Sequence, residues 1–333
     1  MNTKANAMEI ISFGKPERVL TSLPAYVASY HGANHQSFED YKVADGHDKS
    51  VGSKWYDIWG TGWHKEYPGV MGFPRINPLA EIASLSDYVW PKPDDERICH
   101  KIYTEVEQFN AMPDKSEKFL FGSHRDTLWE KSYMLVGMEN MMEYFFTEPE
   151  YAKEVLHNIM DFQIGIAKHY INTGVEVVEL GDDMGTQAGL LLGKNIFNKF
   201  LLPEYRRLFE FYKSHNVFIC FHSCGYIESL LESFIELGVD VLNPVQATAN
   251  NLSRVIEITQ GRMALQGGIS TDLIMTGTPE QIRQTVKDTI MLLGKRGGYF
   301  CSPDQYLPFP DESIAVFGEA VAEFGRYSAI KDS

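Results

Sequence analysis

Residues 217–225 read Val-Phe-Ile-Cys-Phe-His-Ser-Cys-Gly, an apolar run that ends in a histidine and a cysteine. The run 217–222 predicts a buried strand, and the residues after it repeat apolar positions at helical spacing. The same alternation recurs from about residue 119 onward. The other predicted strands are 119–122, 175–180, 239–242, 263–266 and 298–301, and the predicted helices are 151–172, 195–215, 227–237 and 279–293. Strands that alternate with helices in this way predict a parallel sheet covered by helices.

Two architectures contain such a sheet, an open doubly wound sheet and a closed barrel. No G-x-G-x-x-G follows the first predicted strand, which disfavours the dinucleotide-binding form of the open sheet. We therefore expect an α/β fold, a (β/α)8 TIM barrel, formed as a single domain by residues 1–333. Residues 119–333 would supply the main barrel repeats, and about 1–118 the first barrel elements and an N-terminal cover.

The N-terminal segment is rich in aromatic residues, glycine and proline. Trp55, Trp59 and Trp63 are four residues apart, which fits a hydrophobic helix stripe as well as a face that stacks on a cofactor. Farther along the chain, capping-box patterns at 147–150 and 278–281 predict two helix starts.

Composition and charge restrict the partners and the compartment. The 333 residues carry 30 Lys+Arg and 45 Asp+Glu, a net charge of −15, which opposes binding to nucleic acid and to anionic membranes. The first ten residues lack the apolar stretch of a secretory signal, and four cysteines are too few for a disulfide framework. We therefore expect a cytoplasmic protein whose cysteines are reduced.

His222 and Cys224 are the sharpest chemical signal. They are two residues apart at the end of a predicted strand, so their side chains point to the same side. Cys301 ends another predicted strand, and strand ends of one barrel share a rim. Three nitrogen and sulfur ligands with an open fourth position are typical of catalytic zinc. Buried cysteines are also common in protein cores, so spacing alone leaves that interpretation open, and we expect Cys99 and Cys220 to be core residues.

Three segments resemble the uroporphyrinogen decarboxylase superfamily, specifically its zinc- and cobalamin-dependent methyltransferase branch. They are 179–187 (ELGDDMGTQ), 221–225 (FHSCG) and 238–246 (GVDVLNPVQ), and residues 57–60 and 85–94 look like the family's N-terminal stretch. In the methylcobalamin:coenzyme M methyltransferases of that branch, an H-x-C…C motif holds zinc. The 76 residues between Cys224 and Cys301 look like the gap in that motif. The resemblance implies a (β/α)8 barrel, a Zn²⁺ site at His222, Cys224 and Cys301, and methyl transfer.

Further polar residues follow predicted strands and are candidates for the same rim. Asp182 and Asp183 fit a solvated turn or helix cap as well as a catalytic role that orients the substrate, and Glu179 could point inward beside them. Gln246 is a possible residue of the substrate pocket. His31, His35, His47 and His64 are expected to be surface or loop histidines rather than ligands.

Three functions remain in view. In the first, a zinc-dependent methyltransferase moves a methyl group between a small molecule and a cobalamin carried by a partner corrinoid protein. The partner is expected because the nearest match to the corrinoid motif D-x-H-x-x-G, at 45–50, has Ser50 in place of glycine. The second function is a metal-free decarboxylase, which the lack of arginine between Arg18 and Arg75 disfavours, because the substrate of uroporphyrinogen decarboxylase carries eight carboxylates. The third is a non-enzymatic accessory protein that binds a corrinoid or a metal.

Overall fold

A computed structural model describes residues 1–39 and 49–331 of the chain. Its main sheet has seven parallel strands in the order β1-β5-β6-β7-β8-β9-β10. Their bounds are β1 Ala25–Ser29, β5 Phe119–Ser123, β6 Val177–Gly181, β7 Phe218–His222, β8 Val241–Val245, β9 Ala264–Ile269 and β10 Tyr299–Pro303. All six strands expected from the alternating pattern are therefore present, within two or three residues of their predicted ends.

The sheet curls so that its last strand reaches the chain just before its first. Leu20 forms a parallel bridge with Phe300, and the N–H of Cys301 donates to the carbonyl of Leu20 at 2.8 Å. This bridge lies where an eighth strand would close the barrel, so the described residues build a TIM-barrel-like fold with seven full strands.

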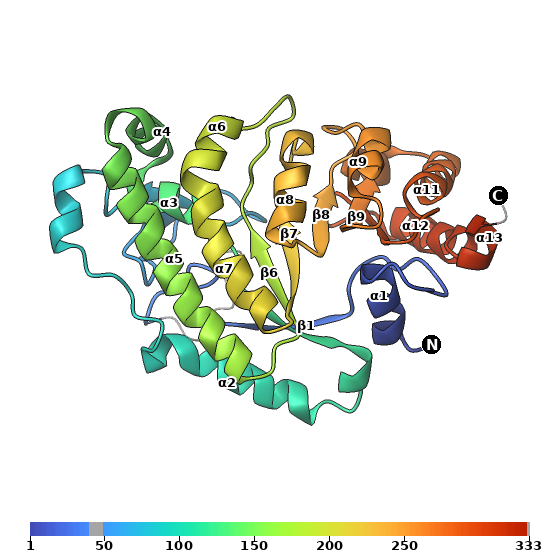
Figure 1. Ribbon diagram of the computed structural model, residues 1–333, viewed down its shortest axis with the longest axis horizontal. Coiled ribbons are helices and arrows are strands. Elements are labelled where there is room, and N and C mark those ends of the chain that lie inside the picture. The colour runs from blue at the N-terminus through green and yellow to red at the C-terminus, as the bar shows by residue number, and fades with distance from the viewer. Residues whose placement is uncertain (40–48, 332–333) are drawn as a thin grey trace.

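Helices cover the outer face of the sheet, and Figure 1 shows α5, α7 and α8 side by side along it. The helices after the first barrel strand are α2 Glu96–Ala111, α3 Trp129–Val136, α4 Met138–Thr147, α5 Pro149–Asn172, α6 Lys194–Ile196, α7 Leu202–Ser214, α8 Leu231–Leu237, α9 Leu252–Thr259, α10 Thr271–Thr276, α11 Pro279–Leu293, α12 Asp311–Phe324 and α13 Tyr327–Lys331. One π-helical turn, Phe197–Leu201, joins α6 to α7. Within the described ranges no helix has the length and apolar character that a membrane span needs.

Alternate residues of strands β5 to β10 belong to two different hydrophobic clusters. The inner cluster fills the barrel with Phe119, Phe121, Val177, Cys220, Val241, Ala264 and Phe300. Helix α1, Thr3–Ile11, adds Ala7 and Ile10 to this cluster and so plugs the end of the barrel at which the strands begin. The outer cluster packs the opposite strand faces against the helices, with Val178, Ile219 and Leu265 next to Ile159, Leu208 and Val286.

Capping residues predicted from the sequence can be compared with the observed helix ends. Thr278 forms the predicted capping box with Gln281 at the start of α11. The helix start predicted at 147–150 is also observed, since α5 begins at Pro149, but Thr147 does not cap it. Thr147 is the last residue of α4, and its hydroxyl donates to the Glu143 carbonyl at 3.1 Å. Gly238 ends α8 in the left-handed conformation, which a glycine adopts without strain.

The N-terminal cover contains a three-stranded antiparallel sheet of β2 Lys54–Tyr56, β3 Gly62–His64 and β4 Phe73–Ile76. Trp55 and Trp63 are direct cross-strand partners in it, with ring centroids 6.2 Å apart. Trp59 lies in the connecting loop and packs against Phe162. Neither interpretation of the tryptophan spacing holds, since the segment is a hairpin and the buried Trp59 and Trp63 offer no face to a cofactor.

Candidate metal centre and substrate cavity

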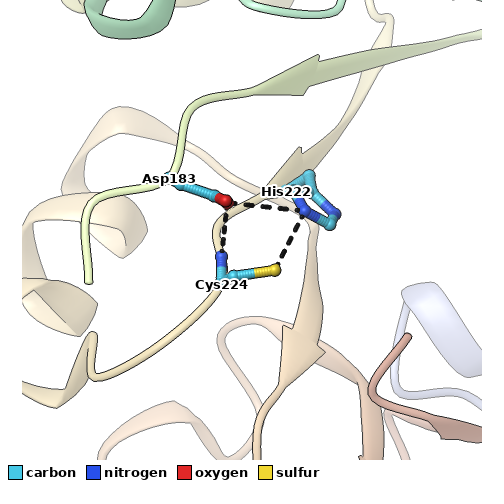
Figure 2. A group of neighbouring side chains, drawn as sticks. All are labelled: Asp183, His222 and Cys224. Carbon is cyan, nitrogen blue, oxygen red and sulfur yellow. Dashed lines mark hydrogen bonds and ion pairs between the residues drawn. The ribbon is translucent and has the colours of Figure 1, made fainter. Parts of the chain in front are cut away.

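Asp183, His222 and Cys224 meet at the end of the barrel where the strands terminate. Asp183 follows β6, His222 is the last residue of β7, and Cys224 follows β7. One ligand atom from each residue lies within 4.8 Å of the other two. Figure 2 shows the three side chains turned toward one another. The structure therefore brings together two of the three expected metal ligands and adds a carboxylate that we expected in a catalytic role.

His222 is oriented by a neighbour on β8. Its Nδ1 lies 2.9 Å from Oδ1 of Asn243, so Nδ1–H donates to that amide oxygen and Nε2 keeps its lone pair. Nε2 lies 3.3 Å from Sγ of Cys224 and 3.6 Å from Oδ1 of Asp183. A metal-binding histidine is commonly held through its second nitrogen in this way.

Cys224 is held from both sides. Its backbone N–H donates to Oδ1 of Asp183 at 2.9 Å, and the Gln305 amide donates to its Sγ at 2.8 Å. Burial, with Asp183 nearby, raises the pKa of the Cys224 thiol to about 12. A cation bound between these groups would favour the thiolate instead.

The structure does not bring Cys301 to this group. Cys301 lies within β10 rather than at its end, is fully buried, and belongs to the outer cluster between the sheet and the helices. Its neighbour Phe300 is the residue that faces the barrel interior. Among the described residues, the group close enough to hold a metal consists of Asp183, His222 and Cys224, without the third ligand expected from the sequence. Cys99 and Cys220 are buried core residues, as expected.

Asp182 points away from the cavity and into the protein. It is fully buried and accepts hydrogen bonds from the backbone N–H groups of Leu128 at 2.8 Å and Glu130 at 2.7 Å, and from the Tyr205 hydroxyl. Burial raises the pKa of Asp182 to about 7. The side chain thus caps the start of α3 from a neighbouring strand, which is the cap interpretation of this residue.

Gln246 also acts on the loops of the rim. Its Oε1 accepts a hydrogen bond from the Gly225 N–H at 2.8 Å, and Gly225 follows Cys224 directly. Through this bond Gln246 supports the loop that carries Cys224. In the described part of the chain, Gln246 does not line the cavity at this rim.

A cavity of about 350 Å³ opens beside the ligand group. Its walls are Ser123, Arg125, Asp126, Glu130, Glu179, Leu180, Gly181, Asp183, His222 and Gln305. The inward position expected for Glu179 is therefore observed. Arg125, Asp126, Glu130 and Gln305 were not expected, because each follows a strand without a pattern that marks it as functional.

Asp126 connects the cavity to a buried polar cluster beneath the N-terminal cover. Its Oδ2 lies 3.0 Å from Nε2 of His35, which is 1% exposed. Burial lowers the pKa of His35, and Lys131 adds a positive charge near both groups. His31 and His35 lie in loops as expected but are buried, and His47 falls outside the described residues, together with most of the 45–50 match to the corrinoid motif.

Comparisons with known proteins agree with this architecture. The family model described as uroporphyrinogen decarboxylase (URO-D) matches residues 127–324. A methylated-thiol--coenzyme M methyltransferase of Methanosarcina mazei is 24% identical over 292 residues, which cover 79% of this chain and 77% of that protein. A uroporphyrinogen decarboxylase of Nostoc punctiforme is 22% identical over 209 residues, 61% of this chain and 54% of that protein. A solved methyltransferase from Methanosarcina mazei superposes with a TM-score of 0.70 at 15% identity, covering 97% of this chain and 99% of that one, which shows the shared fold.

Proposed function

Since the chain belongs to the uroporphyrinogen decarboxylase family, we propose that it is a zinc-dependent methyltransferase. It would move a methyl group between a small molecule and a cobalamin carried by a partner corrinoid protein. The observation that carries this proposal is the convergence of Asp183, His222 and Cys224 beside a cavity at the barrel rim. The similarity to a methylated-thiol--coenzyme M methyltransferase supports the same reaction class.

The donor set suits zinc. Imidazole nitrogen, thiolate sulfur and carboxylate oxygen are its usual ligands, and three protein ligands leave one position for a substrate. Asp183 and the Cys224 thiolate would together balance the charge of Zn²⁺. Bound zinc would supply Lewis-acid activation, lowering the pKa of a substrate thiol or polarising a substrate oxygen.

The protein's own residues hold this arrangement in place. Asn243 fixes the ring of His222, Gln305 contacts the Cys224 sulfur, and Gln246 anchors the loop at Gly225. With a thiol acceptor, the sulfur–carbon bond forms as the cobalt–carbon bond breaks. The electron pair of the broken bond stays on cobalt, and the thiol proton passes to solvent. With a methylated donor the same bonds change in reverse.

The cavity walls argue against the decarboxylase alternative. In the described part of the chain, the cavity wall holds one arginine, Arg125, and four carboxyl groups, those of Asp126, Glu130, Glu179 and Asp183. A substrate with many carboxylates would meet like charges there, which costs binding free energy.

Zinc content and methyl exchange test the proposal together. Purified protein is expected to hold about one zinc per chain by elemental analysis. Cys224→Ser and His222→Ala should lose most of it, while Cys301→Ser and Cys99→Ser, which change buried cysteines outside the ligand group, should keep it. Loss of zinc from Cys301→Ser would restore the ligand set expected from the sequence.

Activity is measured with methylcobalamin and a panel of thiols under anaerobic conditions, followed by the absorbance change at cobalt. The reverse direction uses a corrinoid protein and methylated small molecules. Zinc-dependent change is expected in at least one direction. Its absence in both directions would leave an accessory protein as the better interpretation.

A further inference from the structure

The charges around the cavity do not cancel once the metal site is filled. The Asp183 carboxylate and the Cys224 thiolate would offset the charge of a divalent metal. The ion pair with His35 and the positive charges of Lys131 and Arg125 favour the ionised form of Asp126. Three carboxyl groups, those of Asp126, Glu130 and Glu179, therefore stand against these two cations, so full ionisation of the wall leaves one carboxylate without a counter-charge.

Among the described residues, the Glu130 carboxyl group has one polar contact from a side chain. Its Oε1 accepts a hydrogen bond from the Tyr133 hydroxyl at 3.2 Å. Burial raises the pKa of Glu130, and Asp126, Asp182 and Asp183 add to that effect, so the neutral acid is favoured until a cation lies beside it. Within residues 1–39 and 49–331, neither Glu130 nor Glu179 forms an ion pair with a lysine, arginine or histidine.

We propose that the cavity takes a small thiol or thioether whose other end carries an ammonium group, paired with Glu130 or Glu179. The inference rests on the proposed methyl transfer and names its substrate class. The sulfur would lie at the His222 and Cys224 end of the cavity, and a volume of about 350 Å³ suits a molecule of few heavy atoms. A thiol with a sulfonate end, such as coenzyme M, would instead bring a negative charge toward the two glutamates.

Three thiols of equal chain length separate charge from size. They are 2-aminoethanethiol, which carries an ammonium group, neutral 2-mercaptoethanol, and 2-mercaptoethanesulfonate, which is coenzyme M. Each is titrated into the zinc-loaded protein by calorimetry without methylcobalamin. The ammonium thiol is expected to bind ~10-fold or more tightly than the sulfonate, since like charges in an interface are strongly disfavoured and complementary ones are not. The preference should shrink at high salt.

Variants that remove one carboxylate each test whether the two glutamates cause the preference for the ammonium thiol over the sulfonate thiol. Glu130→Gln and Glu179→Gln keep the side-chain shape, so each should reduce the ratio of the two affinities, and the double variant should bring it near one. Glu150→Gln, on the exposed surface of α5, is the matched control and should leave the ratio unchanged. Circular dichroism and zinc content verify that each variant is folded and loaded.

The outcomes distinguish this inference from the proposed function. Equal affinities for the three thiols, or a preference for the sulfonate, would overturn the ammonium assignment while methyl transfer from methylcobalamin stands. An unchanged ratio in the Glu130→Gln, Glu179→Gln double variant would also overturn it. If none of the thiols binds the zinc-loaded protein and none accepts a methyl group, both the substrate class and a thiol-directed function fail.

Discussion

His124 is a buried histidine that joins the rim of the barrel to its helical layer. It is 1% exposed, its Nδ1 lies 2.7 Å from Oε1 of Gln163, and its Nε2 is hydrogen-bonded to the Tyr212 hydroxyl. Burial lowers the pKa of His124 to about 4, although the bond to Gln163 acts in the opposite direction. The folded protein therefore holds the neutral ring, whereas the unfolded chain protonates it near pH 6.5.

The pH dependence of stability should report this difference. Because the folded pKa is depressed, the contribution of His124 is present above about pH 6.5 and is lost as the pH falls toward 4, amounting to roughly 3 kcal/mol. We expect His124→Gln to flatten the fall in the free energy of unfolding over this range, measured by urea denaturation at several pH values. His100→Gln, at an exposed position, is the control. Equal slopes in wild type and His124→Gln would assign the acid sensitivity to other groups.

Single residues also show where sequence patterns stop being informative. The strand pattern placed His222 and Cys224 correctly because their strand ends at His222. Cys301 could not be placed, because both faces of β10 are buried, and a strand that is apolar on both faces does not reveal which residues point into the barrel. Gln305 carries no sequence signal, and its role depends on a contact with Cys224 across 81 positions.

At the level of elements, apolar runs predicted six strands of the barrel because parallel strands are buried on both faces. The helix at 279–293 was predicted to the residue, since Thr278 and Pro279 mark its start. The hairpin of β2 and β3 was missed because tryptophans four residues apart also fit a helix. Gly60 and Gly62 were the opposing signal, since glycines weaken a helix and permit a turn.

The ligand group lies on two loops, the loop after β6 with Asp183 and the loop after β7 with Cys224. They pack against each other at Gly185. Gly185 follows Asp183 and packs on the loop of Cys224, where an added Cβ would meet the backbone N and O of Tyr226, both at 2.5 Å. The N–H of Tyr226 also donates to the Thr186 carbonyl at 2.8 Å. The separation of the two loops therefore sets the position of Asp183 relative to Cys224.

Gly185→Ala should push these loops apart. We expect zinc affinity to fall by ~10-fold or more, the effect typical of residues that support metal ligands, and the melting temperature of the metal-free protein to decrease slightly. Gly189→Ala is the matched control in the same loop, because an added Cβ there meets nothing within 4 Å. Competition with a chromophoric chelator measures both affinities. Wild-type affinity in Gly185→Ala would show that the ligand geometry does not depend on this contact.

At the scale of the whole molecule, the two ends of the barrel have separate tasks. The end at which the strands begin is closed by α1, whose Ala7, Ile10 and Ile11 are buried against the first residues of the strands. The opposite end carries the ligand group and the cavity. Such a division is usual for barrels with parallel strands, where loops at one end can change without loss of the core.

Variants at the two ends should therefore have opposite effects. Ile10→Ala removes three carbons from a fully buried site and should lower the free energy of unfolding by ~2–5 kcal/mol, while zinc content stays at the wild-type level. His222→Ala should lose zinc, while the metal-free protein unfolds at the wild-type denaturant midpoint, because the side chain is partly exposed and outside both hydrophobic clusters. Ile314→Ala, at a position of α12 that is 41% exposed, controls for the size of the truncation. Urea denaturation of chelator-treated protein and elemental analysis of untreated protein give the two readouts. If Ile10→Ala lost zinc in proportion to stability, the metal site would be coupled to the barrel core, and the rim could not vary independently of the fold.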